Sequence, residues 1–351
     1  MIKCFLNLNI LSFKEVSYVL PTKLKKGDEI RVISPSCSLS IVSNTNQELA
    51  IKRLTDMGFQ VTFSTYADEI DRFASSSISS RVQDLHDAFR DPNVKAVLTT
   101  LGGYNSNGLL KHLDYDLIRE NPKFFCGYSD ITALNNAIYT KTGLVTYSGP
   151  HFSSFGMEKG LEYTTDYFLK CLTSNEPIEV LPSETWSDDS WYIDQENREF
   201  IKNEGYVSIH EGEATGEIIG GNMSTLNLLQ GTPYMPNLQD KILFLEEDSL
   251  TGKATLNTFD RYLHSLMQQP NFEHIKGIVI GKMQKGAQCT IEDIQEMIAS
   301  KPELAHTPII ANASFGHTTP IFTFPIGGRA KIISNKEKTS ITILTQHKRS
   351  E

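Results

Sequence analysis

The stretch KFFCGYSDIT, residues 123–132, runs from a short apolar strand directly into the start of a helix. Around it, short apolar runs rich in β-branched residues alternate with longer segments of helical period. Strands are predicted at residues 29–34, 58–64, 95–100, 123–127 and 144–148, and helices at 46–57 and 80–89. Because parallel neighbours need crossover connections, this alternation is typical of a parallel sheet flanked by helices. Residues 21–182 are therefore predicted to form an α/β domain.

The second half of the chain, residues 216–351, repeats this alternation. It opens with a predicted glycine-rich turn, GEIIGGN, at residues 216–222. Helices are predicted at about 224–229, 255–267 and 291–299, strands at 241–245, 277–280 and 308–311, and a β-hairpin at 330–334 and 339–344. We expect a second α/β domain with a small β appendage.

Residues 183–215 join the two halves and differ from them in composition. They are rich in Asp and Glu, poor in aliphatic residues, and contain both tryptophans, Trp186 and Trp191. A loop of this length is usually functional or disordered. We predict a connecting loop, in which the tryptophans either form a lid over a binding site or anchor the linker on the domain surface.

The composition limits the function classes. The chain has 351 residues, which suggests about two domains. Its 33 basic and 42 acidic side chains give a formal net charge of −9, and 39% of the residues are hydrophobic. That apolar share supports a real core and excludes a mainly disordered chain. A net-acidic chain without a long run of Lys or Arg is a poor candidate for binding nucleic acid polymers or an anionic membrane.

Cysteine spacing and hydropathy bear on the compartment. The five cysteines are far apart and include no C-x-x-C pair: Cys4, Cys37, Cys126, Cys171 and Cys289. This argues against a disulfide framework or a Cys-rich zinc site and is typical of a reducing compartment. No apolar run approaches the ~20 residues that a membrane span needs. Residues 1–20 make a weak signal peptide and fit an N-terminal extension equally well, so we expect a cytoplasmic protein.

Ser129 lies at the predicted turn between a strand and a helix that begins near Asp130. A serine at such a turn projects its hydroxyl from the sheet edge, and the free N–H groups of the helix start can hold a developing oxyanion. The sequence G-Y-S-D matches only part of the G-x-S-x-G pattern. Because Ser and Asp are also favoured N-cap residues, a helix cap is the alternative interpretation.

The glycine pair Gly102-Gly103 directly follows the strand predicted at 95–100. Adjacent glycines let the backbone approach a ligand and point N–H groups into a site. The pair matches neither the dinucleotide-binding pattern nor a Walker motif. A plain tight turn is the alternative.

A serine nucleophile needs a base and an acid that orients the base. His317 follows a predicted strand, and α/β proteins place their sites in loops at the carboxyl edge of the sheet. His151 is the competing base. The candidate acids are Glu246, Glu247 and Asp248, at the end of another strand. A solvated acidic turn is one alternative for them, and a carboxylate metal site, which lacks a paired His at ligand spacing, is another.

Six motifs, in this order, resemble the serine LD-carboxypeptidase family. They are GGYNSNGLL (102–110), NPKFFCGYSDITAL (121–134), TGLVTYSGP (142–150), GGN (220–222), ILFLE (242–246) and FGHTTPIFTFPIG (315–327). Within the family they are most similar to the microcin C self-immunity peptidase branch, from about Pro21 to the C-terminus. The resemblance implies a Rossmann-like N-terminal domain, a C-terminal domain, small and β-barrel-like, that carries the acid and the base, and a homodimer.

The resemblance implies a Ser-Glu-His triad that works without a metal or other cofactor. It assigns Ser129 as the nucleophile and His317 as the general base. Glu246, at the end of the LFLE strand, is the acid, but the strand continues as LFLEEDSL, so Glu247 stays an alternative. The oxyanion hole is assigned to backbone N–H groups of Asp130 and of the turn at Gly102 and Gly103.

Two departures from the murein-recycling enzymes bear on the substrate. Asn105 stands in a motif that resembles GGYGS in those enzymes. The Trp-bearing stretch looks like the immunity branch's insertion, in which an aromatic ring stacks on the substrate's nucleotide, and Tyr192 could equally be the partner. The candidate substrate-binding residues are Asn105, Trp186, Trp191 and Asn222.

The resemblance therefore implies a serine peptidase or amidohydrolase that cleaves an amide in peptidyl- or aminoacyl-nucleotides of the microcin C type. Within the enzyme class, a muramoyl-tetrapeptide LD-carboxypeptidase of murein recycling is the alternative. From another class, a non-catalytic two-domain protein that holds a small ligand in its linker cleft is an alternative, since two α/β halves joined by a long loop suit it too. We expect no nucleic acid polymer and no membrane as partner.

Overall fold

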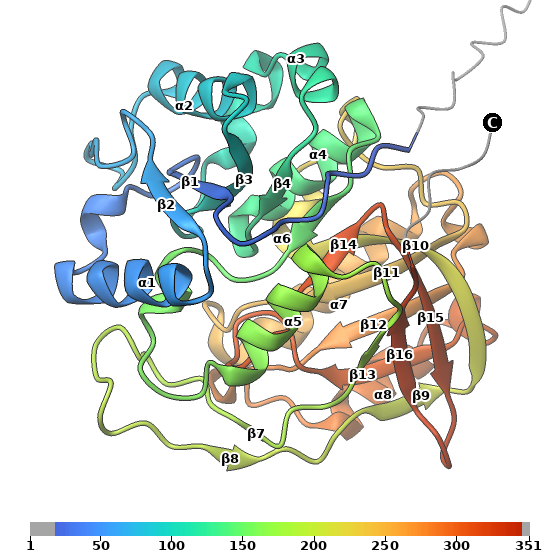
Figure 1. Cartoon of the computed structure of the whole chain (residues 1–351). Coiled ribbons are helices and arrows are strands. Elements are labelled where there is room, and N and C mark those ends of the chain that lie inside the picture. The colour runs from blue at the N-terminus through green and yellow to red at the C-terminus, as the bar shows by residue number, and fades with distance from the viewer. Residues whose placement is uncertain (1–17, 346–351) are drawn as a thin grey trace, which may run out of the picture.

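The computed structural model describes residues 18–345 and contains two large β-sheets and one two-stranded sheet, with helices packed around the large ones (Figure 1). The predicted N-terminal extension, residues 1–20, lies almost wholly outside the described residues. Among residues 18–345, no helix is both long and apolar enough to cross a membrane. The predicted α/β class, with a parallel sheet in the N-terminal half, is confirmed.

The first sheet has six strands in the order β14-β5-β4-β3-β1-β2. Its strands are β1 (Glu29–Ile33), β2 (Gln60–Phe63), β3 (Val94–Thr99), β4 (Phe124–Cys126), β5 (Thr146–Ser148) and β14 (Phe324–Ile326). All pairs are parallel except that of β14 with β5. The helices around it are α1 (Asn44–Asp56), α2 (Ile78–Arg90), α3 (Tyr115–Glu120), α4 (Thr132–Thr142) and α5 (Glu162–Thr173).

The second sheet has eight strands in the order β6-β16-β15-β10-β11-β12-β13-β9. Its strands are β6 (Ile178–Val180), β9 (Val207–His210), β10 (Gly212–Asn222), β11 (Lys241–Glu246), β12 (Gly277–Gly281), β13 (Ile309–Ala313), β15 (Arg329–Ser334) and β16 (Ser340–Ile343). Its helices are α6 (Met223–Asn227), α7 (Thr255–Met267) and α8 (Ile291–Ala299). The sheet curls so that Ser208 Oγ and Ser334 Oγ lie 2.9 Å apart. The predicted C-terminal hairpin is confirmed as the antiparallel pair β15 and β16.

Short 3-10 helices connect many of these elements. They are η1 (Leu39–Ile41), η2 (Ser106–His112), η3 (Ser129–Ile131), η4 (Ser153–Gly156), η5 (Gly252–Ala254), η6 (Phe272–His274), η7 (Lys285–Ala287) and η8 (Pro302–Leu304).

The apolar core lies on both faces of the sheets. Neighbouring strand residues point to opposite faces, so Phe124 packs in one buried cluster and Phe125 in the other. The first cluster includes residues of α1 and α5, and the second includes residues of α2, α3 and α4. Each cluster continues into the second sheet, through Phe244 in one and Leu243 in the other. The two sheets therefore share their core.

Two strands cross the predicted boundary between the halves. Strand β6 precedes residue 183 but pairs with β16 in the second sheet. Strand β14 belongs to the C-terminal part but pairs with β5 in the first sheet. The segment between β13 and β14, which contains His317, therefore passes from one sheet to the other (Figure 1). The division of the chain at residues 183–215 stays a prediction.

The prediction of a loop over residues 183–215 is wrong for part of that stretch. Strands β7 (Thr185–Trp186) and β8 (Ile201–Lys202) pair with each other, and β9 pairs with β13 at the edge of the second sheet. These strands are short and lie at sheet edges, where polar side chains can face outward. Their polar composition therefore gives no strand pattern in the sequence.

The predicted glycine-rich turn at residues 216–222 is also wrong, because these residues form the end of β10. The strand pairs with β11 on one side and β15 on the other. Gly220 has φ +126°, and a Cβ at this position would overlap the backbone oxygen of Phe244 on β11. Position 220 is therefore a glycine because two backbones approach each other closely inside a sheet, and not because the chain turns there.

Helix α4 docks on this glycine-bearing part of β10. Thr132 Oγ1 accepts a hydrogen bond from Asn222 N at 2.9 Å. One turn further along, Asn136 Nδ2 donates to Gly220 O at 2.8 Å and Asn136 Oδ1 accepts from Gly220 N at 3.2 Å. Residues four apart lie on the same face of a helix. This contact joins the helix that follows Ser129 to the second sheet.

A substitution of Gly220 tests the close approach. We expect Gly220→Ala to lower the free energy of unfolding by about 3 kcal/mol or more, because it adds a steric overlap to the strain of a positive φ. Gly231 is the matched control, since its φ is +73° but nothing lies within 4 Å of the position of its Cβ. Gly231→Ala should cost only about 1 kcal/mol. Urea unfolding measures both, and equal losses would contradict the account.

Candidate active site

Ser129 lies at the turn between β4 and α4, as predicted, with φ +59°. A non-glycine residue in this left-handed region is strained, as in the nucleophile elbow. The alternative interpretation of Ser129 as a helix cap is wrong. The N-cap residues of η3 and α4 are Tyr128 and Ile131, and neither makes a side-chain capping bond. The hydroxyl of Ser129 contacts a histidine instead.

His317 connects Ser129 to Glu246. Its Nε2 lies 3.0 Å from Ser129 Oγ, and its Nδ1 lies 2.8 Å from Glu246 Oε2. Glu246 ends β11 and is 4% exposed, and Ser129 follows β4 in the other sheet. The carboxyl ends of strands from the two sheets therefore meet at these three side chains. This edge of a sheet is where α/β folds place their sites.

Burial and charge act in opposite directions on His317. Burial alone would lower the pKa of His317, but Glu246 and, more weakly, Asp248 and Glu247 raise it to about 9. The protonated imidazole is thus the form that this environment favours. Such surroundings stabilise a base that becomes positively charged during a reaction.

Glu247, the alternative acid, points to different partners. Its carboxylate accepts hydrogen bonds from Ser224 N at 2.9 Å and from Asn222 Nδ2 at 3.2 Å. Burial first, and then the charges of Glu246 and Asp248, raise the pKa of Glu247 to about 7. Glu247 therefore holds the start of α6, and Glu246 makes the contact with His317.

His151, the competing base, lies beside the site but makes other contacts. Its Nδ1 lies 2.8 Å from Thr99 Oγ1, and its ring stacks on Tyr128 with the centroids 4.4 Å apart. Burial, and then the nearby His317, lower the pKa of His151 to about 3. It therefore stays neutral at physiological pH.

The predicted oxyanion donors lie at the start of η3 and in the glycine turn. In the part of the chain that the structure describes, Gly102 N and Gly103 N donate no turn or loop hydrogen bond, and the backbone bond at the start of η3 is donated by Ile131 N to Tyr128 O at 3.1 Å. The position that a Cβ on Gly102 would take lies 3.0 Å from Ser129 Oγ, so the glycine turn rests directly against the serine. Free N–H groups next to a nucleophile are what an oxyanion hole requires.

The four predicted substrate-binding residues are spread around the site. Asn105 Oδ1 accepts a hydrogen bond from Arg81 at 2.8 Å. Asn222 caps α6, with Oδ1 accepting from Thr225 N at 3.1 Å. Both side-chain amides thus hydrogen-bond other residues of the chain, and their role in substrate binding stays a prediction.

The two tryptophans lie in different surroundings. Trp186 belongs to β7, and the ammonium groups of Lys282 and Lys285 lie 4.9 and 6.0 Å from its ring centre. Trp191 makes an edge contact with Tyr192, which is 66% exposed. Lys282 was not among the predicted residues, and its only signal in the sequence is its place directly after β12, a buried strand.

The Trp-bearing stretch is fixed to both halves of the molecule. Ser187 and Thr319 exchange two backbone hydrogen bonds of 2.8 and 2.7 Å, only two residues from His317. On the other side, Gln195 Nε2 donates to Gly156 O at 2.8 Å. These contacts support the interpretation of the stretch as an anchored connection, and its action as a lid stays a prediction.

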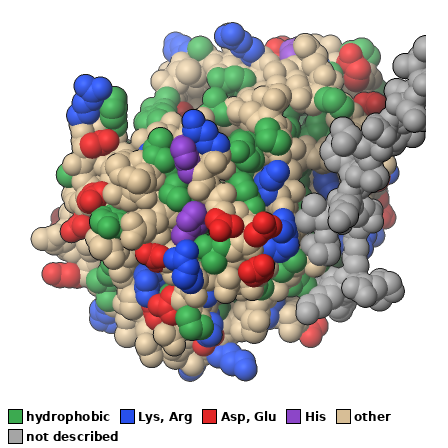
Figure 2. All heavy atoms as spheres, turned by 90° about the horizontal axis from the view of Figure 1, so that it is seen from above, with side chains coloured by type: hydrophobic (Ala, Val, Ile, Leu, Met, Phe, Trp, Pro, Cys, Tyr) green, Lys and Arg blue, Asp and Glu red, His purple; other side chains and the backbone are tan. Residues whose placement is uncertain are grey.

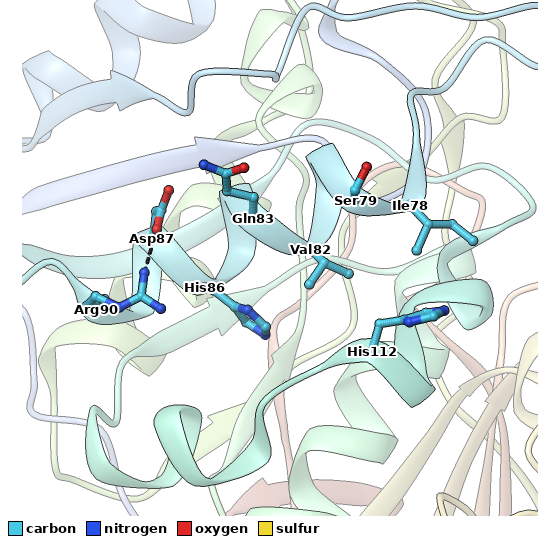
Figure 3. A pocket seen from close by; sticks show the side chains of 8 residues that line it. All are labelled: Ile78, Ser79, Val82, Gln83, His86, Asp87, Arg90 and His112. Atoms are coloured by element: carbon cyan, nitrogen blue, oxygen red, sulfur yellow. Dashed lines mark hydrogen bonds and ion pairs between the residues drawn. The ribbon is translucent and has the colours of Figure 1, made fainter.

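A hollow of about 740 Å³ runs along α2 (Figure 3), and none of the predicted site residues lines it. Seen from above, the surface carries acidic and basic side chains mixed together, without a broad basic area (Figure 2). Among residues 18–345, no group of three or more His, Cys, Asp or Glu side chains is arranged to hold a metal ion.

Comparisons with known proteins identify the family of the chain. The LD-carboxypeptidase N-terminal domain matches residues 30–149, and the LD-carboxypeptidase C-terminal domain matches residues 215–332. The putative carboxypeptidase YocD of Bacillus subtilis is 56% identical over 311 residues, which are 89% of this chain and 95% of that protein. The microcin C7 self-immunity protein MccF of Escherichia coli is 31% identical over 341 residues, 92% of this chain and 96% of that protein.

A solved structure has nearly the same fold. The MccF-like protein from Bacillus anthracis superposes with a TM-score of 0.93 and 90% sequence identity, covering 93% of this chain and 100% of that one. Both family domains match in chain order, and the relatives are matched over most of their length. The chain therefore belongs to the LD-carboxypeptidase family of peptidases.

Proposed function

We propose that this protein is a serine amidohydrolase that cleaves an amide in peptidyl- or aminoacyl-nucleotides. Ser129 is the nucleophile, His317 the general base and Glu246 the acid that orients it. The observation that carries the proposal is the pair of contacts at His317, 3.0 Å to Ser129 and 2.8 Å to Glu246. The homodimer and the cytoplasmic location expected from the sequence stay predictions.

In the proposed reaction, His317 Nε2 takes the proton of Ser129 while Oγ attacks the carbonyl carbon. The N–H groups of Asp130 and of the Gly102-Gly103 turn hold the negative oxygen of the tetrahedral intermediate. His317 then protonates the leaving nitrogen, the C–N bond breaks, and the acyl group stays on Ser129. Water attacks this ester, His317 accepts its proton, and Ser129 leaves with that proton to restore the enzyme.

Glu246 serves two purposes in this scheme. It fixes the ring so that Nε2 faces Ser129, and its charge stabilises the imidazolium formed when Ser129 attacks. A neutral His151 cannot provide this, because its Nδ1 lies against the Thr99 hydroxyl and not against a carboxylate.

Two observations support a nucleotide-bearing substrate. Lys282 Nζ lies 4.9 Å from the ring centre of Trp186, next to the backbone bridge to Thr319, whereas Lys285 is already paired with Glu199 at 3.0 Å. An aromatic face suits a base, and the ammonium group of Lys282 suits a phosphate. Among relatives, solved structures of MccF hold glutamyl sulfamoyl guanosine and aspartyl sulfamoyl adenosine.

Substitutions of the two glutamates separate the acid from its neighbour. We expect Ser129→Ala to abolish turnover and Glu246→Gln to lower kcat by about 10³- to 10⁴-fold, because the imidazole loses its orientation and its counter-charge. Glu247→Gln, the matched control, should stay within about tenfold of the wild type, since Glu247 bonds α6. Steady-state kinetics and thermal unfolding are measured together. A fully active Ser129→Ala protein, or a larger loss for Glu247→Gln than for Glu246→Gln, would refute the assignment.

The substrate is tested by offering both classes to the same enzyme. We expect an aminoacyl sulfamoyl adenosine or an aminoacyl phosphoramidate of adenosine to be cleaved, with the free amino acid detected by mass spectrometry. A muramoyl tetrapeptide should remain intact. Cleavage of the tetrapeptide alone would move the function to murein recycling, for which a probable murein peptide carboxypeptidase of Bacillus subtilis, 30% identical, is the relative.

The rate should depend on pH through His317. The base works only when it is neutral, and the surrounding carboxylates raise the pKa of His317 to about 9. We therefore expect kcat/KM to rise with pH and to level off above about pH 9. In Glu246→Gln the midpoint should move to lower pH, since the charge that favours the imidazolium is gone. A wild-type midpoint at the ordinary histidine value of 6.5 would contradict this prediction.

A further inference from the structure

The side chain of Asp130 has no part in the proposed hydrolysis, which uses only its backbone N–H. The residue is 2% exposed. A buried carboxylate is costly unless hydrogen-bond donors surround it. Its contacts therefore indicate what the carboxylate stabilises.

Asp130 holds the loop that follows β3. Its Oδ2 accepts hydrogen bonds from Asn105 N at 3.0 Å and from Ser106 N at 2.9 Å, and its backbone oxygen accepts from Ser106 Oγ at 2.7 Å. Its Oδ2 also accepts from Ser36 Oγ at 2.5 Å, which adds the loop after β1. The residue next to the nucleophile thus binds two other loops at the carboxyl edge of the sheet.

Arg81 closes the same loop from the opposite side. This residue of α2 is 5% exposed, and its Nη1 donates to Asn105 O at 3.2 Å, to Asn105 Oδ1 at 2.8 Å and to Pro35 O at 3.1 Å. Asn105 therefore lies between a buried carboxylate and a buried guanidinium. A charge on each side makes these hydrogen bonds stronger than neutral ones.

The loop fixed in this way carries the second oxyanion donor. Residues 101–103 form no helix or strand, and the next residue, Tyr104, is 77% exposed. The segment contacts the loop after β1, where Cys37 N donates to Gly102 O at 3.2 Å, and Asp130 binds that same loop through Ser36. A Cβ on Gly102 would lie 2.9 Å from Ser129 Cβ, so the turn must stay close to the serine. A donor displaced by a few tenths of an ångström loses much of its effect on the transition state.

We propose that the Asp130 carboxylate is the positioning residue of the oxyanion hole, because it bonds the Gly102-Gly103 loop to the turn that carries Ser129. This inference rests on the proposed function. One residue then supplies one oxyanion donor through its backbone and positions the other through its side chain.

Replacement of Asp130 should affect kcat more than KM. We expect Asp130→Ala to lower kcat about 10²-fold, comparable to the loss of one oxyanion donor, with KM within about threefold. Asp130→Asn keeps an oxygen that can accept the same hydrogen bonds without the charge, so about a tenfold loss is expected. The pH midpoint assigned to His317 should stay in place in Asp130→Asn, because the contacts of His317 are unchanged.

Asp84 provides a matched control. It is 3% exposed, and both of its oxygens accept from the backbone of the loop after β2, at Tyr66 N, at 3.2 and 3.1 Å. Asp84 lies on α2, and Asp84→Ala removes an equally buried carboxylate that bonds a loop of the same sheet in which no oxyanion donor lies. It should lower the melting temperature while leaving kcat within about threefold of the wild type.

The deciding experiment is the rate at which a fluorophosphonate labels Ser129 in the full chain, followed by mass spectrometry beside thermal unfolding. The phosphonyl oxygen occupies the oxyanion hole in the tetrahedral adduct, so labelling reports on the hole directly. We expect the wild type and Asp84→Ala to label at equal rates and Asp130→Ala about 10²-fold more slowly. Labelling of a folded Asp130→Ala protein at the wild-type rate, or an equal slowing in Asp84→Ala, would overturn the inference.

Two further outcomes are also decisive. If Asp130→Ala does not fold, Asp130→Asn decides: slower labelling at an unchanged melting temperature supports the inference, and the wild-type rate overturns it. If the wild type itself is not labelled, the proposed function fails and the inference with it. If the wild type is labelled and the Asp130 variants label at the same rate, the proposed function stands and only the inference is overturned.

Discussion

The contact between helix α4 and strand β10 fixes the position of the nucleophile relative to its base. Thr132 and Asn136 hydrogen-bond the backbone of Asn222 and Gly220, and Asn222 lies beside Glu246 in the sheet register. Because α4 begins three residues after Ser129, this contact determines where the serine meets the second sheet. Gly221 permits it, since a Cβ there would overlap Thr132 Oγ1, and Gly220 lets β10 lie close to the backbone of β11. Two side chains 188 residues apart in sequence, Ser129 and His317, thereby come within hydrogen-bond distance.

Charge is distributed unevenly around this junction. The formal net charge of −9 suggests at first a surface property, but three acidic residues in sequence, Glu246 to Asp248, all raise the pKa of His317. Two of them, Glu246 and Glu247, are buried. Hydrogen bonds from Ser224 and Asn222 offset the cost of burying the Glu247 carboxylate. His151, whose ring stacks on Tyr128, is buried and has no neighbouring carboxylate that raises its pKa, so it stays neutral. His317 can thus accept a proton and the buried His151 cannot, and the difference lies in the neighbouring carboxylates.

Much of the fold and part of the site could be predicted from the sequence. The alternation of strands and helices, and the position of Ser129 between a strand and a helix, are short-range patterns. Glu246 and Glu247 could not be separated, because neighbouring strand residues point to opposite faces and only the partner shows which face matters. The glycines of residues 216–222 indicated a turn, since the backbone that approaches them belongs to a distant strand. The role of the Asp130 side chain was hidden for the same reason: its partners Ser36 and Asn105 lie 94 and 25 residues away in sequence.

The central claim is that His317 accepts the proton of Ser129 at Nε2 while the Glu246 carboxylate holds its Nδ1. A ¹⁵N-¹H NMR titration of the histidine rings tests it most directly, with His317 assigned through a His317→Gln variant. The account predicts that His317 titrates near pH 9 in the wild type, with Nδ1 carrying the proton in the neutral form, and that Glu246→Gln brings the midpoint down by more than one pH unit. A midpoint near 6.5 that does not move in Glu246→Gln would contradict it.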